Sequence, residues 1–267
     1  MEKAKRKLIL VDDINFHLVN TKNRLKEHYE IYPAQDAEIL FEILENIIPE
    51  LILLDINIPK VDGFEILKRL KSDARYFEIP VIFFTGNKNR ANIIKGMTLG
   101  AVYFITKPFK EKEAIECIEN QLDPKKREKN RPIILAVDDS PSILREINTV
   151  LKEQYIIYGL PSPENATELL ETITPDLFIL DYQMPAITGF DLVPVIRAIP
   201  KYEKTPIVFL TSEGTFNNLS KAIELGASDF LVKPIDPPSL REKIALHLVD
   251  YLIQRQMRSL KPNLDDY

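Results

Sequence analysis

Short apolar runs alternate with amphipathic stretches throughout this chain. In the first half, strand-like apolar runs occupy residues 7–13, 30–34, 50–55, 80–85 and 102–106. The stretches between them carry apolar residues at helical spacing, at 16–29, 36–48, 63–71 and 89–100. Runs 50–55 and 80–85 are apolar almost throughout, as parallel strands covered on both faces should be. The pattern predicts five strands alternating with five helices, which is a doubly wound α/β domain.

The second half of the chain repeats the first without a gap, at a constant offset of 126 residues. Its strand-like runs fall at 134–139, 155–160, 176–181, 206–211 and 229–233. The offset carries the Asp12-Asp13 pair onto Asp138-Asp139 and the sequence LILLD onto LFILD. This period is too long for a solenoid repeat, so it indicates a duplicated domain.

The length of 267 residues suits two domains of about 120 to 130 residues each. Between the two copies, residues 123–132 carry many charges and no large apolar side chain, which is typical of a solvated linker or a helix tail. We therefore predict a first domain at 1–124, a linker at 125–132, a second domain at 133–255 and a C-terminal tail at 256–267.

Composition and charge narrow the class of protein. Apolar residues make up 45% and charged residues 28%, with a net charge of −5, which indicates a globular chain and argues against direct nucleic-acid binding. No apolar run reaches the roughly 18 residues of a membrane span, and the N-terminal run ends at Asp12, too early for a signal peptide. The single Cys117 fits a reducing compartment. We expect a cytoplasmic protein without membrane insertion.

Polar residues follow four strands of the first copy, at the points where those strands end. They are the Asp12-Asp13 pair, Asp55, Thr85 and Lys107. Parallel sheets bind ligands at the carboxyl ends of their strands, so these groups should meet at one edge. Three carboxylates repel one another unless a cation neutralises them, and oxygen ligands suit Mg²⁺. A carboxylate beside Mg²⁺, a hydroxyl and an ammonium can accept a phosphoryl group.

Each of these residues also has an ordinary structural interpretation. An aspartate pair after a strand often caps the next helix, a Thr commonly ends a strand, and Lys-Pro is usually a turn. The recurrence of the whole set at one offset favours a functional site in both copies.

The combined motif resembles the receiver domain of bacterial two-component response regulators. An acidic pair is followed by an Asp 42 residues later, a Thr 30 residues further and a Lys-Pro 22 residues beyond that. The resemblance covers residues 7–122 and 133 to about 250. It implies two flavodoxin-like doubly wound (βα)5 domains, each with a five-stranded parallel sheet and helices on both faces.

The resemblance also implies roles for individual residues. Asp55 and Asp181 would accept the phosphoryl group and help to bind Mg²⁺, for which Mn²⁺ could substitute. Within each copy, the second aspartate of the acidic pair would bind the metal directly and the first mainly through water. A backbone carbonyl two residues past the acceptor would complete the metal site. The implied metal ligands besides the acceptors are Asp12, Asp13, Asn57, Asp138, Asp139 and Gln183.

The remaining implied residues read and transmit the phosphorylated state. A lysine, followed by a cis peptide bond to proline, would pair with the acyl phosphate, and a threonine would bond the phosphoryl oxygens. An aromatic residue would then rotate inward and remodel the surface of helix 4, strand 5 and helix 5. These residues are Lys107, Thr85 and Phe104 in the first copy and Lys233, Thr211 and Phe230 in the second.

The implied function is that of a tandem-receiver response regulator in a two-component or phosphorelay pathway. A sensor histidine kinase or a phosphotransfer protein would donate the phosphoryl group, and the output would pass through protein contacts to a downstream target. Such a chain is not an enzyme beyond its own phosphorylation and dephosphorylation chemistry.

Three other interpretations stay open at this point. The chain could be the receiver portion of a longer regulator, such as a diguanylate cyclase. It could be an aspartate-nucleophile phosphohydrolase, although those enzymes place an acid where this chain has Asn57 and Gln183. It could also be an interaction protein that acts without phosphorylation.

Two further features separate the copies. Near the pocket mouth the first copy has Asn57 and Asn87 where the second has Gln183 and Glu213, which predicts different lifetimes for the two acyl phosphates. Residues 239–260 form a longer amphipathic stretch than their first-copy match, either an ordinary final helix or one that pairs with the first domain or a second subunit. A homodimer is therefore one outcome of that pattern.

Overall fold

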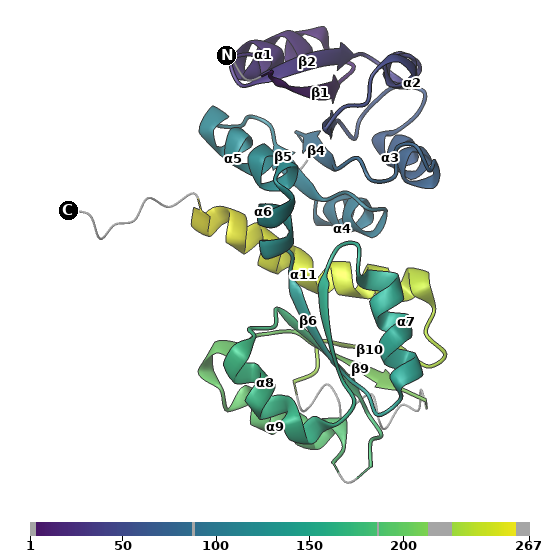
Figure 1. The fold of residues 1–267 in the computed structure, drawn as a ribbon, viewed down its shortest axis with the longest axis vertical. Coiled ribbons are helices and arrows are strands. Elements are labelled where there is room, and N and C mark those ends of the chain that lie inside the picture. Colours follow the sequence, from purple (N-terminus) through teal and green to yellow (C-terminus); the bar gives the residue numbers. More distant parts are fainter. Residues whose placement is uncertain (1–3, 87–88, 186, 213–225, 260–267) are drawn as a thin grey trace, which may run out of the picture. The chain divides into compact units, whose positions relative to one another are not determined.

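The computed structural model describes residues 4–86, 89–185, 187–212 and 226–259, with side chains described as far as Val249. The chain divides into two compact units, of which the first ends at Asn130 and the second begins at Arg131 (Figure 1). No helix among the described residues combines the length and the apolar character needed to cross a membrane.

The first unit is built around a five-stranded, all-parallel sheet in the order β2-β1-β3-β4-β5. Its strands are β1 (Arg6–Val11), β2 (Tyr29–Ala34), β3 (Leu51–Leu54), β4 (Val81–Thr85) and β5 (Tyr103–Thr106). Its helices are α1 (Asn15–Leu25), α2 (Ala37–Asn46), α3 (Gly63–Ser72), α4 (Arg90–Thr98), α5 (Glu111–Leu122) and α6 (Pro124–Lys129).

The second unit repeats this sheet, with the strand order β7-β6-β8-β9-β10. Its strands are β6 (Ile133–Val137), β7 (Ile156–Leu160), β8 (Leu177–Asp181), β9 (Ile207–Thr211) and β10 (Asp229–Val232). Its helices are α7 (Pro141–Leu151), α8 (Ala166–Thr172), α9 (Gly189–Arg197) and α11 (Pro237–Ser259), with 3₁₀ turns η1 (Pro163–Asn165) and η2 (Pro200–Tyr202). The predicted fourth helix of this copy falls within 213–225, outside the described residues.

Residues that are 126 positions apart in the sequence pair in the same way in the two sheets. Leu8 lies opposite Leu51 between β1 and β3, and Ile134 lies opposite Leu177 between β6 and β8. The predicted fold class, two doubly wound domains with parallel sheets, is confirmed.

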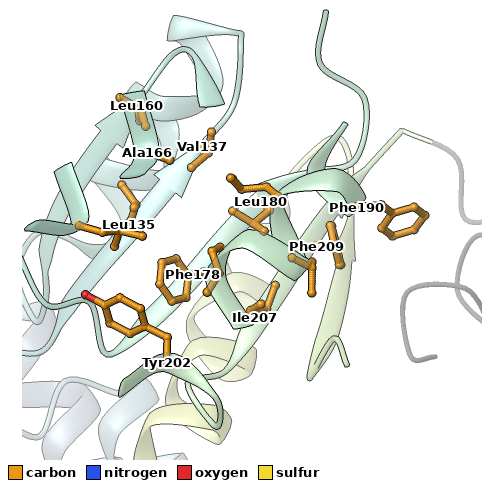
Figure 2. Close-up of a cluster of buried hydrophobic side chains, with 14 of the residues drawn as sticks. Leu135, Val137, Leu160, Ala166, Phe178, Leu180, Phe190, Tyr202, Ile207 and Phe209 are labelled. Atoms are coloured by element: carbon orange, nitrogen blue, oxygen red, sulfur yellow. The ribbon is translucent and has the colours of Figure 1, made fainter. Parts of the chain in front are cut away.

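Alternate residues of each central strand pack on opposite faces of the sheet. In the second unit, Leu135 and Val137 belong to the cluster under α8 and α9, where Phe178 and Tyr202 also pack (Figure 2). Their neighbours Ile134 and Ala136 belong to the other cluster, with side chains of α7 and α11. Both faces are therefore covered, which explains why the central strands are apolar almost throughout.

Two boundaries differ from the sequence prediction. The predicted helix at 16–29 ends at Leu25, because Tyr29 begins β2 and is buried against the sheet. The charged segment predicted as a linker contains helix α6, whose first turn is capped by the Asp123 carboxylate accepting from the Lys125 and Lys126 amides. The cap satisfies amides that would otherwise lack a partner.

Two glycines adopt the left-handed region of backbone conformation. Gly100 after α4 has φ +102°, and its repeat partner Gly226 has φ +88°. Only glycine adopts this conformation without strain, so the predicted helix end at Gly100 is confirmed.

Candidate functional site

The predicted site residues lie at the carboxyl edge of each sheet. In the first unit, Asp12 follows β1, Asp55 follows β3, Thr85 ends β4 and Lys107 follows β5. Their partners at the offset hold the same positions in the second unit: Asp138 after β6, Asp181 and Thr211 at the ends of β8 and β9, and Lys233 after β10. The parallel order of the strands therefore brings these groups to one edge of each sheet.

An ammonium group bridges two buried carboxylates in the first unit. Lys107 Nζ donates to Asp12 Oδ2 and to Asp55 Oδ2, the latter at 2.6 Å. The carboxylates are 1% and 7% exposed, so their charges depend on this cation for compensation. The predicted neighbourhood of Asp12, Asp55 and Lys107 is present in the structure.

The second unit repeats this arrangement with slightly longer contacts. Lys233 Nζ lies 2.7 Å from Asp138 Oδ2 and 3.0 Å from Asp181 Oδ2. Here too the carboxylates are almost fully buried, at 0% and 4% exposed. The same ion-pair geometry arises twice, from residues that are far apart along the chain.

Burial and the opposite charge of the partner shift the pKa values of Asp181 and Lys233 in opposite directions. Burial raises the pKa of the Asp181 carboxyl, the Lys233 hydrogen bond lowers it and repulsion from Asp138 raises it, so the pKa stands above its usual value. Burial lowers the pKa of Lys233, but its hydrogen bonds to the two aspartates outweigh that effect and raise it. The lysine therefore stays charged beside Asp138 and Asp181 and compensates their negative charge.

Backbone amides orient the carboxylates. The Ile14 amide donates to Asp12 Oδ1 at 2.9 Å, and the Ser140 amide donates to Asp138 Oδ1 at the same distance. Asp55 Oδ1 accepts a hydrogen bond from the Asn57 amide at 3.3 Å, which leaves Oδ2 to the lysine. These short-range bonds set the direction in which each carboxylate points.

Potential metal-ligand atoms gather beside Asp55 and Asp181. In the second unit, one carboxylate oxygen from each of Asp138, Asp139 and Asp181 lies within 4.8 Å of the others. Three carboxylates at this spacing fit a hard divalent cation such as Mg²⁺. The predicted second-copy aspartates are therefore brought together as one cluster.

The corresponding cluster of the first unit has a different member. It consists of Asp12, Asp55 and His17 within the same 4.8 Å limit, and it does not include Asp13. The sequence predicts a metal-ligand role for Asp13, which stays a prediction, and it indicates no role for His17. The signal that could have found it is the repeat itself, since the offset sets Ile143 opposite His17 in the second copy.

The switch residues differ between the units. Thr85 and Thr211 are both buried at the ends of their strands. Phe104 is already buried, at 6% exposed, and it lines a small cavity together with Thr85, Ile93 and Met97. Phe230 is only partly buried. The two aromatic rings therefore differ in how deeply they are buried.

The remaining predicted features are located as follows. The Lys107-Pro108 and Lys233-Pro234 peptide bonds are both cis, as the resemblance implied. Asn57 and Gln183 are exposed, and the Ser212 hydroxyl donates to Gln183 Oε1 at 3.4 Å. Asn87 and Glu213 lie outside the described residues.

Two glycines near the acceptors were not assigned a role from the sequence. A Cβ atom on Gly63 would lie 2.3 Å from the Asp55 carbonyl oxygen, and one on Gly189 would lie 2.2 Å from that of Asp181. The start of α3, and likewise of α9, thus lies directly against the acceptor loop. Their constant spacing from the two acceptors was the available signal.

Comparison with known proteins finds the same family in both units. A family model described as the response regulator receiver domain matches residues 8–119 and 134–245, one match in each unit. Response regulator PleD of Caulobacter vibrioides is 24% identical over 291 aligned residues, covering 97% of this chain. The chain spans 64% of the length of PleD.

Shorter relatives match one unit at a time. Two-component response regulator ORR11 of Oryza sativa is 36% identical over 108 residues, covering 40% of this chain and 74% of the relative. The solved structure of Vibrio cholerae chemotaxis protein CheY4 has 31% sequence identity and a TM-score of 0.43, covering 44% of this chain and 99% of its own.

Proposed function

Because the chain belongs to the response regulator receiver domain family, with two receiver domains in tandem, we propose that it is a phosphorylation-controlled signalling protein that accepts phosphoryl groups on Asp55, Asp181 or both. The observation that carries this proposal is the buried aspartate-lysine-aspartate bridge at the sheet edge of each unit. Such a bridge keeps a charged carboxylate in the interior of the unit. Burying a charge without a partner costs a large amount of free energy, so the lysine is needed to hold both aspartates there.

The acceptor carboxylate is the nucleophile in the proposed chemistry. An Asp55 or Asp181 oxygen forms a bond to phosphorus while the bond between phosphorus and the donor nitrogen breaks, and that nitrogen keeps the electron pair. The product is an acyl phosphate on the aspartate. The lysine ammonium, already beside the acceptor, shifts to the phosphoryl oxygens, and the threonine hydroxyl at the neighbouring strand end donates to them.

The acidic clusters fit a divalent cation, and we assign them to Mg²⁺, with Mn²⁺ as a substitute. The cation neutralises charge on the phosphoryl oxygens when bound. Asp138, Asp139 and Asp181 would hold it in the second unit, together with the Gln183 carbonyl. In the first unit the corresponding carbonyl is that of Asn57.

The phosphoryl donor we propose is a sensor histidine kinase or a phosphotransfer protein, both in the cytoplasm. The chain then acts as an acceptor whose only catalysis is its own phosphorylation and dephosphorylation. Its output is a changed protein-binding surface at the fourth helix, fifth strand and fifth helix of a unit.

Phosphorylation of the full chain by a small donor tests the acceptor assignment. We would incubate it with phosphoramidate and Mg²⁺ and count phosphoryl groups per chain by intact mass spectrometry. Asp55→Asn and Asp181→Asn should each lose one labelled site, and the double variant should take up none. A chelator should suppress labelling in every variant that retains an acceptor.

A matched control is Asp62→Asn, because Asp62 is an exposed helix cap in the same unit. It should be labelled like the wild type. Full labelling of the double variant would show that the acceptors lie elsewhere. Transfer from purified candidate kinases to the same variants then identifies the donor and the domain that is phosphorylated first.

A further inference from the structure

The second unit has an edge strand whose outer side is left open. Strand β7 lies at one end of its sheet, next to β6, as β2 lies next to β1 in the first unit. Among the residues that the structure describes, no strand pairs with the other side of β7. Such an edge offers its outward backbone groups to any further strand that can reach it.

The hydrogen bonds to β6 show which groups of β7 face outward. The Ile156 amide donates to the Pro132 carbonyl at 2.9 Å, and the Leu160 carbonyl accepts from the Asp138 amide at 3.2 Å. The backbone groups of Ile156 and Leu160 therefore point toward β6. Because these groups alternate sides along a strand, the N–H and C=O groups of residues 157 and 159 point away from the sheet.

The first unit blocks the matching edge, and the second does not. In β2, Pro33 stands at the position of Gly159, and proline has no N–H to donate. The exposed Glu30 of β2 adds a charge where β7 has Ile156. Proline and charged residues are two means by which natural sheets prevent edge pairing. Strand β7 therefore keeps the pairing groups that β2 lacks.

We propose that β7 is a self-association surface, to which a second copy of this chain adds its own β7 in antiparallel orientation. The two sheets then form one continuous sheet across a two-fold axis. This inference concerns the edge of the second unit and does not depend on the proposed phosphoryl chemistry.

The arrangement of β7 about Tyr158 fits a copy of itself. A two-fold axis at Tyr158 sets Ile157 opposite Gly159 of the second copy, so the residues with outward backbone groups meet as hydrogen-bonded pairs. This pair occurs twice by symmetry and satisfies the outward groups of both strands. Tyr158 is 37% exposed and would lie opposite its own copy at a non-hydrogen-bonded position, where side chains come closest.

Side-chain size and charge also favour this partner. Gly159 is exposed and has no side chain, so it leaves room for Ile157 of the second copy. Residues 154–163 include no charged side chain, so self-pairing brings no like charges opposite each other. An extended segment of another protein would need its own fit to this edge, whereas a second β7 fits by symmetry.

Sedimentation velocity of the full chain over a range of concentrations tests the inference. We expect the wild type to show a monomer–dimer equilibrium. Gly159→Pro copies β2 into β7 and removes an outward N–H without removing a bond to β6. It should weaken the dimer by about tenfold or more, since each dimer loses two hydrogen bonds.

Charge substitutions at Tyr158 supply a test that misfolding cannot imitate. Tyr158→Glu and Tyr158→Lys should each lose the dimer, because like charges would lie opposite each other. An equal mixture of the two variants should regain it, because opposite charges then lie opposite each other. Tyr32→Glu alters the matching residue of β2 and should dimerise like the wild type, and circular dichroism checks the fold of every variant.

Hydrogen exchange locates the contact directly. Exchange in a peptide that covers residues 154–162 should slow as the wild type dimerises and stay fast in Gly159→Pro. A chain that is monomeric at every concentration would overturn the inference. A dimer that all the β7 variants retain would also overturn it, because the copies would then pair elsewhere. Asp55→Asn and Asp181→Asn should dimerise like the wild type, so failure of the proposed phosphoryl chemistry would leave the inference standing.

Discussion

At the scale of single residues, the loops that follow Asp55 and Asp181 depend on two positions without a side chain. Gly63 and Gly189 start α3 and α9, and a Cβ atom on either would lie well inside contact distance of the acceptor's carbonyl oxygen. That carbonyl belongs to the backbone, which cannot move aside as a flexible side chain can. In each unit, the backbone of the aspartate therefore lies in close contact with the start of the following helix.

We expect Gly63→Ala to lower the free energy of unfolding of the first unit by about 2–3 kcal/mol, because the methyl group forces the Asp55 loop away from α3. Chemical denaturation followed by circular dichroism measures the loss, and labelling by phosphoramidate should fall at Asp55. Gly86→Ala is the matched control, since a Cβ there has no atom within 4 Å. Equal losses in the two variants would contradict the close-contact explanation.

At the scale of elements, helix α9 contains a proline that α3 lacks. Sequence reasoning left open whether Pro194 lies in the first turn or inside the helix. The helix begins at Gly189, so Pro194 is interior, and its side chain is exposed. Proline there removes one backbone hydrogen bond and crowds the preceding turn.

Pro194→Ala should therefore stabilise the second unit by about 1–3 kcal/mol. Thermal or urea unfolding of the variant measures the gain. The control is Lys68→Ala at the matching exposed position of α3, which should change stability by less than about 0.5 kcal/mol. A destabilised Pro194→Ala variant would mean that α9 requires the kink.

Strand β10 and helix α11 of the second unit are joined by a charged cluster. Asp229 accepts from Lys243 at 2.6 Å and lies 3.0 Å from His247 Nε2, and the Lys243 ammonium lies 5.3 Å from the centre of the Phe230 ring. The first unit has Tyr103, Cys117 and Gln121 at these positions. The cluster thus connects α11 to the predicted switch aromatic in one unit only.

The pKa of Asp229 gives this cluster a defined pH dependence. Burial raises it, but hydrogen bonds from Lys243 and His247 outweigh burial and lower it below the usual 3.8. A depressed carboxyl pKa contributes stability above the unfolded value and loses it as the pH falls through the folded value. Asp229→Asn should therefore cost about 1–2 kcal/mol at neutral pH, a difference that shrinks as the pH falls below about 4 and is lost below the folded pKa.

Urea denaturation of the wild type and Asp229→Asn between pH 3 and pH 7 measures that difference. Glu242→Gln removes the same charge from an exposed position of α11 and should have little effect at any pH. A difference that is constant across the range would assign the effect of Asp229→Asn to packing and not to charge.

At the scale of the whole molecule, each unit has its own five-stranded sheet and its own buried core. Leu53 of β3 packs with α1 and α5, and its repeat partner Ile179 of β8 packs with α7 and α11; both are fully buried. A domain with its own hydrophobic core can unfold as a separate cooperative unit.

Leu53→Ala and Ile179→Ala should each lower the stability of their own unit by about 2–5 kcal/mol, through lost apolar contact and the cavity left behind. Native-state hydrogen exchange with peptide resolution reports the two units separately. The unaltered unit is the internal control in each variant. Equal loss of protection in both units would show that the chain unfolds as one cooperative block.

Much of the fold was accessible from sequence because strands, helices and the repeat are encoded locally. Buried strands such as 51–54 need a continuous apolar run, and their acceptor aspartates follow at the carboxyl end. The boundaries were less accurate, as at Leu25, because helix ends depend on what the next element contacts. The position of His17 beside Asp12 was not predicted, because a single His among apolar helix positions has no local signature.

The sequence by itself determined the duplicated α/β architecture, the order of strands and helices along the chain and the identity of the aspartates at the strand ends. Only the tertiary structure decided that Lys107, 95 residues after Asp12, reaches both carboxylates, and that the His17 imidazole lies beside Asp12. It also decided that Phe104 is buried while Phe230 is only partly so. The physical reason is that apolar periodicity is a property of neighbours in the chain, whereas ion pairs, ligand clusters and burial depend on distances that the packed sheet and helices create.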